Sequence, residues 1–249
     1  KLGLAESKLK EIVDKSQSVS SMVVDISDGN RCDEFINSAV DRHQKIDILV
    51  NNAGVYGPFG EVNQENWNDW IQTLKINVFG SVYMSSRVVP IMKKNMKGKI
   101  IQLSGGGATN PLPFISAYAC SKTAIVRYAE TLSKELRDYN IDVNSIAPGA
   151  LNTRMLEMVL DAGPKTVGHD FYEKSKKQKK TGGVPLEVGA KLAVFLASEK
   201  SNGISGKLIS AVWDDWEVWP EHIKELDSSD IYTLRRISGR DRQKEWGDK

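Results

Sequence analysis

Ile46-Asp47-Ile48-Leu49-Val50-Asn51-Asn52-Ala53-Gly54 is the stretch that decides the fold. Its first five residues form an apolar run of the length of a buried strand, and amide and small residues follow at once. Similar apolar runs alternate with helical patterns along the chain, at 22–26, 99–104, 141–146 and 206–211. Nearly continuous apolar strands separated by helices are typical of a parallel sheet with helices on both faces. We therefore expect an α/β fold built on a doubly wound parallel sheet.

The segments between these runs have the apolar spacing of amphipathic helices. The spacing predicts the end of a helix in residues 5–16 and further helices at about 30–44, 67–94, 116–138 and 186–197. Ser27-Asp28 suits the cap of the second of these helices. Residues 150–182 are expected to be irregular or short-helical. Their basic run at 174–180 is interpreted as a solvated helix, with recognition of an anionic substrate group as the alternative.

Unusual residues gather where the predicted strands end. Such sheets bind their ligands beyond the carboxyl ends of the strands. Each of these segments taken alone is compatible with an ordinary turn. Their convergence at one edge of the sheet favours a binding site, and its segments are Asp25, 51–54, Ser104-Gly105 and Pro148-Gly149.

Tyr118 and Lys122 stand four residues apart at the start of the predicted helix 116–138. This spacing places them one turn apart on the same face. An ammonium near a phenol stabilises the phenolate and lowers the tyrosine pKa, which suits a general acid/base. A helix start with a surface lysine is the bland alternative, because the spacing alone is common by chance.

Composition excludes several classes of protein. The 249 residues carry 34 basic and 32 acidic side chains, so the net charge of +2 does not favour nucleic acid as a partner. No apolar stretch approaches the length of about 20 residues needed to span a membrane. The cysteines and the three histidines share no metal-ligand spacing, so we expect no metal site. Two widely separated cysteines favour a reducing, cytoplasmic location.

Together these residues resemble the short-chain dehydrogenase/reductase family. The matches extend from about residue 5 to residue 211 and occur in the family's order. The resemblance implies a Rossmann-like doubly wound sheet, NAD or NADP as the cofactor, and hydride transfer between an alcohol and a carbonyl. The matching segments are Asp25, 51–54, Asn77 within 75–80, Tyr118 with Lys122, and Pro148-Gly149 with Thr153.

The resemblance also implies roles by position. Tyr118 would exchange the proton with the substrate oxygen, and Lys122 would hold the nicotinamide ribose and lower the tyrosine pKa. Asn77 would kink its helix and hold a water in a proton relay. The remaining positions would line the cofactor, with Asp25 at the adenine. They are Asp25, Ile26, Asn51, Ala53, Gly54, Pro148, Gly149, Leu151 and Thr153.

The expected catalytic serine is one departure from the family. It usually lies about thirteen residues before the tyrosine, and Gly105 occupies that position here. Either Ser104 serves, with one extra residue in the loop, or the hydroxyl is absent. Ser116 is a weaker candidate, because its place at a helix start also suits a cap. We take Ser104 as the candidate catalytic residue.

The second departure lies near the start of the chain. The family's glycine-rich phosphate loop, with its first strand and helix, is not found, nor is the second strand. We therefore expect residues 1–212 to be an N-terminally truncated domain of the family. The predicted strands at 22–26 and 46–50 would then pair directly or leave a gap. Residues 213–249 form a charged extension that contains three tryptophans at intervals of three, interpreted as packing over a sheet edge or a partner subunit.

Other functions stay open. A non-catalytic dinucleotide-binding or scaffold relative is favoured by Gly105 and by the absent phosphate loop. A nucleotide-sugar epimerase or dehydratase shares the Tyr118 and Lys122 spacing, but the sugar-binding portion would be short. The resemblance also implies a small-molecule alcohol or carbonyl substrate, and a homodimer or homotetramer formed through the helices at 67–94 and 116–138.

Overall fold

A four-stranded parallel sheet lies at the centre of the molecule. The computed structural model describes residues 2–63, 66–244 and 246. The strands pair side by side in chain order, all parallel. They are β1 (Ile48–Asn51), β2 (Gly98–Leu103), β3 (Ile141–Ala147) and β4 (Leu208–Ser210). The predicted α/β architecture with a parallel sheet is thereby confirmed.

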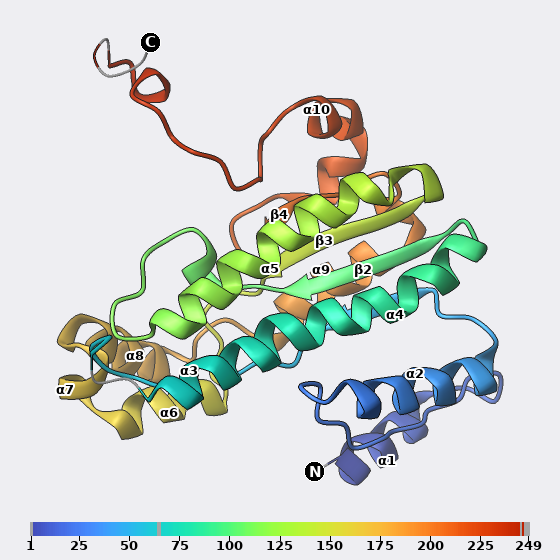
Figure 1. Ribbon diagram of the computed structural model, residues 1–249, viewed down its shortest axis with the longest axis horizontal. Helices are drawn as coiled ribbons and strands as arrows, with labels where there is room; N and C mark the ends of the chain where they lie inside the picture. The colour runs from blue at the N-terminus through green and yellow to red at the C-terminus, as the bar shows by residue number, and fades with distance from the viewer. Residues whose placement is uncertain (1, 64–65, 245, 247–249) are drawn as a thin grey trace.

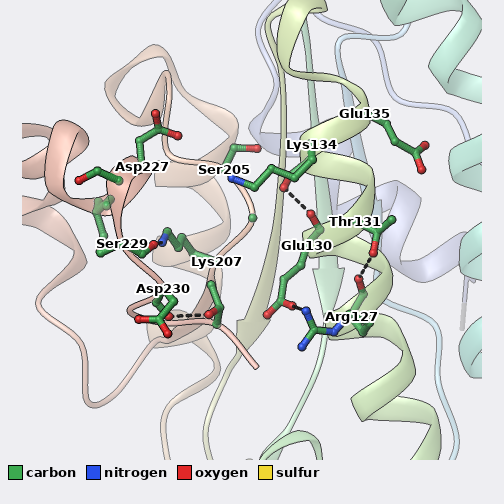
Figure 2. Close-up of a pocket in the computed structure, with 15 residues that line it drawn as sticks. Arg127, Glu130, Thr131, Lys134, Glu135, Ser205, Lys207, Asp227, Ser229 and Asp230 are labelled. Carbon is green, nitrogen blue, oxygen red and sulfur yellow. Dashed lines mark hydrogen bonds and ion pairs between the residues drawn. The ribbon is translucent and has the colours of Figure 1, made fainter. Parts of the chain in front are cut away.

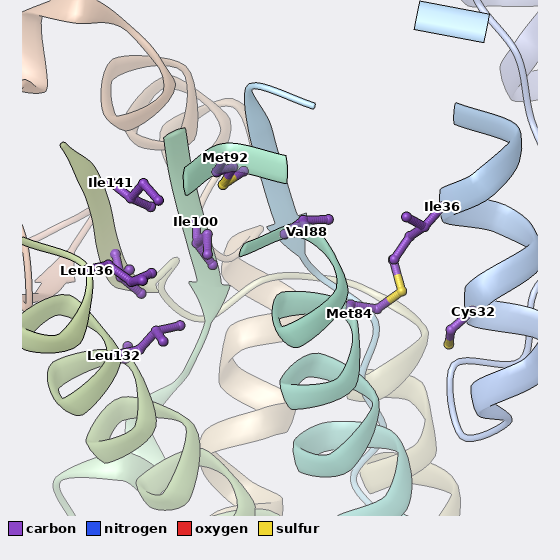
Figure 3. Packing of buried hydrophobic residues seen from close by; sticks show 11 residues of the cluster. Cys32, Ile36, Met84, Val88, Met92, Ile100, Leu132, Leu136 and Ile141 are labelled. Carbon is purple, nitrogen blue, oxygen red and sulfur yellow. The ribbon is translucent and has the colours of Figure 1, made fainter. Parts of the chain in front are cut away.

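Helices cover both faces of this sheet (Figure 1). α4 (Ser81–Lys94) and α5 (Ser116–Glu135) lie on one face, and α9 (Leu186–Ala197) lies on the other. Under α4 and α5, a cluster of buried side chains joins the helices to β2 and β3, and α2 (Gly29–His43) adds Cys32 and Ile36 to it (Figure 3). Burying these aliphatic side chains is worth roughly 1.5–3 kcal/mol each.

The start of α2 shows how the sequence sets a helix boundary. The Asp28 side chain accepts hydrogen bonds from the backbone N–H groups of Asn30 and Arg31. These donors have no partner inside the helix, so the carboxylate satisfies them as an N-cap. The predicted cap is confirmed. α1 (Leu2–Ile12), which precedes it, has no buried residue.

The prediction of a strand at Met22–Ile26 is wrong. Among the residues that the structure describes, no strand pairs with this segment, and Val23 is 77% exposed. A strand needs a neighbouring strand for its N–H and C=O groups, and in the part of the chain that the structure describes β1 is the edge of the sheet. Direct pairing with 46–50, one of the two alternatives expected for these segments, is therefore absent among the described residues. Ile48 and Val50 of the outer strand β1 are 44% and 45% exposed.

Shorter elements surround the carboxyl ends of the strands. α3 (Trp67–Leu74) continues through a π-helix (Lys75–Gly80) into α4, as the predicted long helix at 67–94 requires. α6 (Arg154–Ala162), α7 (Pro164–Val167) and α8 (His169–Thr181) group near the start of α5 (Figure 1). The basic run belongs to α8, where Lys176 pairs with Glu173 and Lys179 with Glu157.

The tryptophan-rich segment is part of the packed body. Trp216 and Trp219 are buried with α9 and the other face of the sheet, whereas Trp213 is 87% exposed. α10 (Ile223–Ser228) follows, and a final stretch leaves the body (Figure 1). Short 3-10 helices occur at Gly106–Ala108, Arg137–Tyr139, Glu199–Ser201, Trp216–His222 and Arg240–Arg242. Among the described helices, none has both the length and the apolar character to cross a membrane.

Candidate functional site

Tyr118 and Lys122 project from the first turns of α5 toward the carboxyl end of β2. The Lys122 Nζ lies 5.5 Å from the centre of the Tyr118 ring. The same ammonium donates a hydrogen bond of 2.7 Å to the carbonyl oxygen of Leu103, the last residue of β2. Lys122 is buried, because α5 lies directly on the sheet. The helix and the strand end therefore fix the lysine together.

The electrostatics of this pair follow from burial. Desolvation lowers the pKa of Lys122 to about 8. Desolvation also raises the pKa of Tyr118, and the neighbouring Tyr56 raises it further. The prediction that Lys122 lowers the tyrosine pKa is not met. The ammonium is engaged by the Leu103 carbonyl, and the loss of water around the phenol is the larger effect.

Asn77 connects the helix before α4 to two other segments. Its Oδ1 accepts from Val55 N at 2.8 Å, and its Nδ2 donates to Val55 O at 2.8 Å and to Ser121 Oγ at 2.9 Å. Asn77 is buried in the π-helical stretch, and such stretches often mark functional sites. The predicted irregularity in this helix is present. A water held there in a relay stays a prediction.

Of the two candidates for the serine position, the structure brings Gly105 to the tyrosine. A Cβ on Gly105 would lie 2.7 Å from the Tyr118 hydroxyl oxygen. The side chain of Ser104 is buried and turned to α5, where its Oγ lies 3.5 Å from the Lys122 carbonyl oxygen. Ser116 accepts a hydrogen bond of 2.9 Å from Trp70 Nε1.

Sequence reasoning did not single out Tyr56, which the structure places against Tyr118. The two ring centres are 4.7 Å apart and the planes meet at 66°, an edge-to-face contact. Burial raises the pKa of Tyr56. The sequence held one signal, an aromatic residue in the glycine-containing loop that follows a strand end. Aromatic residues in loops are common, so that signal was weak.

The residues after β1 divide between structural and site positions. Asn51 donates from Nδ2 to Ser81 O at 3.3 Å and Ser85 Oγ at 3.2 Å, both on α4. A Cβ on Gly54 would lie 3.3 Å from Asn77 Oδ1 and 3.5 Å from Lys122 Nζ. Gly54 therefore lies directly beside the buried lysine, and Ala53 next to it is exposed. A small residue here permits close approach of a ligand.

Asp25 and Ile26 form a turn beside the π-helix. The Asp25 carboxylate accepts from Ser27 Oγ at 2.7 Å and Ser27 N at 2.9 Å, and these bonds lower its pKa. A Cβ on Gly80 would lie 2.7 Å from the Ile26 carbonyl oxygen, so the turn packs closely on the helix. The structure thus places both residues next to the segment that holds Asn77.

The predicted residues after β3 form a tight turn that leads into α6. Gly149 has φ of +95°, in the region that favours glycine. Leu151 forms an isolated parallel bridge with Val184. The Thr153 hydroxyl caps α6 by accepting from Met155 N at 3.3 Å. Pro148 packs on Gly189, whose Cβ would lie 3.0 Å from Pro148 Cβ. These contacts fix the backbone, and a role in cofactor binding stays a prediction.

A surface cavity of ≈ 580 Å³ lies at the opposite end of the sheet, between the second half of α5 and the residues before β4 (Figure 2). Its charged side chains bind the C-terminal segment. Lys207 Nζ donates to Ile231 O at 2.9 Å and Ser229 O at 3.3 Å, and Glu130 Oε1 accepts from Leu234 N at 2.6 Å. Within residues 2–63, 66–244 and 246, no group of three or more His, Cys, Asp or Glu side chains could hold a metal ion.

Two relatives resemble the chain over most of its length. The 3-oxoacyl-(acyl-carrier-protein) reductase FabG of Thermotoga maritima is 30% identical over 204 residues, which cover 82% of this chain and 80% of that protein. Dehydrogenase/reductase SDR family member 4 of Homo sapiens is 34% identical over 192 residues, which cover 77% of this chain and 67% of that protein.

Solved structures share the fold. An NAD+-bound xylitol dehydrogenase superposes with a TM-score of 0.71 at 27% identity, covering 84% of this chain and 83% of that one. ElxO with NADP bound gives a TM-score of 0.67 at 26% identity, covering 77% and 76%. The family model described as short chain dehydrogenase matches residues 2–162, well over half of the sequence. With these matches beside the placement of Tyr118, Lys122 and Asn77, the chain belongs to the short-chain dehydrogenase family.

Proposed function

We propose that this chain is an oxidoreductase that uses NAD or NADP to interconvert an alcohol and a carbonyl by hydride transfer, with Tyr118 as the general acid/base. One observation carries the proposal. Tyr118, the buried Lys122 and the π-helical Asn77 meet at the carboxyl ends of the strands, joined through Val55, Ser121 and Leu103. That edge is where doubly wound sheets bind dinucleotides.

The residues of the site fit a nicotinamide cofactor in one respect that the geometry supports. Gly54 leaves room beside Lys122 and Asn77 that a side chain would restrict. Lys122 would donate to the ribose, and Ala53, Gly149 and Thr153 would line the remainder of the group. When bound, the nicotinamide supplies or accepts the hydride.

The chain's own groups would control the proton. In reduction, the Tyr118 hydroxyl gives its proton to the substrate oxygen. In oxidation, the phenolate takes it back. The raised pKa of Tyr118 holds the phenol protonated in the protein alone, so a nearby cationic charge is needed to favour the phenolate. Lys122, turned from Leu103 toward a ligand, is the charge that this chain offers.

The test has two stages. Fluorescence titration of the full chain with NADH and with NADPH measures binding, and saturation at micromolar concentration is expected. Turnover is then measured on a panel of secondary alcohols and ketones. Tyr118→Phe should abolish turnover and spare cofactor binding. Tyr139→Phe, which removes a phenol hydroxyl in the 3-10 helix Arg137–Tyr139 that follows α5, is the matched control. Turnover retained by Tyr118→Phe overturns the mechanism.

A second candidate, a non-catalytic dinucleotide-binding or scaffold relative, is favoured by Gly105. No serine side chain extends from that position toward Tyr118, and the Ser104 side chain is turned to the Lys122 carbonyl. Binding of NADH or NADPH without turnover of any alcohol or ketone in the panel would support this candidate over the enzyme.

We also propose that the chain acts in the cytoplasm as a homodimer or homotetramer, with residues 1–212 as the catalytic domain and 213–249 as its extension. Cys32 and Cys120 are both free thiols, which supports a reducing compartment. Trp67 and Phe79, exposed on the α3 to α4 stretch, support a contact between copies. Analytical ultracentrifugation tests the assembly, and a monomer at all concentrations would contradict it.

A further inference from the structure

In the part of the chain that the structure describes, the residue against the Tyr118 hydroxyl is Gly105, which has no side-chain donor. The Tyr118 hydroxyl lies over the Gly105 backbone, in the space that a Cβ would fill. Two neighbouring serines contact other groups. Ser104 faces the Lys122 carbonyl, and Ser121 donates to Tyr118 O at 2.7 Å while accepting from Asn77. A carbonyl reduced here would therefore depend on Tyr118 alone, unless another group supplies a donor.

Tyr56 is the one other phenol in contact with Tyr118 in the part of the chain that the structure describes. Its ring lies edge-to-face on Tyr118 and also contacts Phe59, with ring centres 5.8 Å apart. Among the described residues, the Tyr56 hydroxyl makes no hydrogen bond. Tyr56 is half-buried, and its hydroxyl is not one of the fully buried atoms that lack a partner. A ligand in the site can therefore reach this hydroxyl and accept a hydrogen bond from it.

The loop that carries Tyr56 is anchored on both sides. Val55, just before it, is held by two hydrogen bonds to Asn77. Gly60, four residues later, donates from its N–H to Phe114 O at 2.9 Å. An anchored donor costs little reorganisation when charge develops on a bound oxygen, which is the requirement for electrostatic stabilisation of a transition state.

The protonation state of Tyr56 is also suitable. Burial raises its pKa, so the hydroxyl stays protonated and can donate at neutral pH. Tyr118 differs from Tyr56 because the positively charged Lys122 lies near its ring. Tyr118 is therefore suited to exchange a proton with the substrate, and Tyr56 is suited to keep its proton and donate a hydrogen bond.

From this geometry we propose that the Tyr56 hydroxyl is the second hydrogen-bond donor to the substrate oxygen, a catalytic role that rests on the proposed function. In reduction, the carbonyl carbon receives the hydride with its electron pair as the C=O π bond breaks. The oxygen takes the proton of Tyr118, which is left as phenolate. Tyr56 donates a hydrogen bond to that oxygen throughout and transfers no proton. Oxidation follows the same path in reverse.

Tyr56→Phe tests the inference, since it keeps the ring contact with Tyr118 and removes only the hydroxyl. We expect kcat/KM on the active alcohol or ketone to fall about 10²-fold, mainly through kcat, as for the loss of one oxyanion-hole donor. A second measurement titrates 2,2,2-trifluoroethanol, an alcohol that resists oxidation, into the chain with saturating NAD+ or NADP+. Tyr56→Phe should weaken the binding of this alcohol by about tenfold, the factor that corresponds to 1.4 kcal/mol. NADH affinity and the melting temperature should not change. Tyr139→Phe is again the control for loss of a phenol hydroxyl.

Each outcome decides between the two proposals. If Tyr56→Phe stays within twofold of the parent chain in both measurements, while Tyr118→Phe is inactive, the inference is overturned and the proposed function stands. If Tyr56→Phe weakens NADH binding by the same factor as it slows turnover, the residue is structural and the inference also falls. If Tyr118→Phe turns over like the parent chain, or the parent chain neither turns over any substrate nor binds trifluoroethanol, both proposals fall.

Discussion

The side chain of Asn77 holds both backbone polar groups of Val55, accepting from its N–H and donating to its C=O, each at 2.8 Å. These two hydrogen bonds between the π-helix and the loop after β1 fix the loop on which Gly54 and Tyr56 lie. An amide side chain is suited to the task, because it carries a donor and an acceptor side by side.

Asn77→Ala should therefore destabilise the protein. It leaves the Val55 N–H and C=O without their partner and removes the donor to the Ser121 oxygen, which keeps its own bond to Tyr118 O. An unsatisfied buried group costs about 1–3 kcal/mol. We expect the free energy of unfolding to fall by about 2–4 kcal/mol, measured by urea denaturation. Asn95→Ala, at an exposed position after α4, is the control and should change it by less than about 0.5 kcal/mol. Equal effects of the two substitutions would contradict this account.

Gly105→Ser should reduce turnover, although it restores the residue expected at this position in the family. The backbone of Gly105 is extended, with φ of 174°, so a side chain meets no backbone strain. Its Cβ would instead lie 2.7 Å from the Tyr118 hydroxyl oxygen, so Tyr118 must move. We expect a loss of kcat/KM of at least about tenfold, since small displacements of reacting groups are costly. Gly106→Ser is the matched control, because a Cβ there meets nothing within 4 Å. A gain in activity for Gly105→Ser would show that the Tyr118 position adapts.

Lys122 should make stability depend on pH in the alkaline range. Burial lowers its pKa from 10.5 to about 8 in the folded protein. Between these values the unfolded chain binds more protons than the folded one, so the contribution of this group to stability rises with pH. Below pH 8 the full penalty for burying the charge applies. Relative to Lys122→Met, the parent chain should gain on the order of 3 kcal/mol between pH 7.5 and 10.5.

Urea denaturation of both proteins at several pH values measures this difference. The comparison of the two proteins cancels the titration of groups that they share. Lys94→Met, which removes an exposed lysine at the end of α4, is the control for loss of a surface charge. A difference between the parent chain and Lys122→Met that stays constant with pH would contradict burial as the cause.

Lys207→Met should loosen the C-terminal segment without affecting the site at the carboxyl ends of the strands. The buried ammonium of Lys207 lies beside Ser229 (Figure 2) and donates to the carbonyl oxygens of Ser229 and Ile231. Next to it, the Leu208 N–H donates to Tyr232 O at 2.8 Å. Loss of two hydrogen bonds from a charged donor should cost about 2–4 kcal/mol. Hydrogen exchange should show faster exchange at 229–234 and no change at 51–60. Lys224→Met, at an exposed position on α10, should leave both regions unchanged.

Local patterns in the sequence were sufficient for much of the fold. Runs of apolar residues predicted the four strands that pair, and 3.6-residue spacing predicted the helices that cover them. The four-residue spacing of Tyr118 and Lys122 placed both side chains on one helix face, since a helix repeats in less than four residues. Asp28 marked the start of α2 because a side-chain oxygen there satisfies backbone donors only a few residues away.

The strand prediction at 22–26 failed for a physical reason. An apolar extended segment becomes a strand only if another strand offers its backbone groups, and β1 does not pair with it. In the same way, Trp216 and Trp219 belong to the core because α9 and the sheet lie next to them, which no local pattern shows.

By itself the sequence determined the order of the elements, the strand ends that bear polar residues and the pairing of Tyr118 with Lys122, because each depends on residues within a few positions of one another. Only the tertiary structure decided that Lys122 points to Leu103, that Gly105 rather than Ser104 lies at Tyr118, and that Tyr56 packs on the same ring. These relationships join segments far apart in the chain. They depend on how α5 lies on the sheet and on the loops that Asn77 and Phe114 anchor, and therefore on packing that no single stretch of sequence encodes.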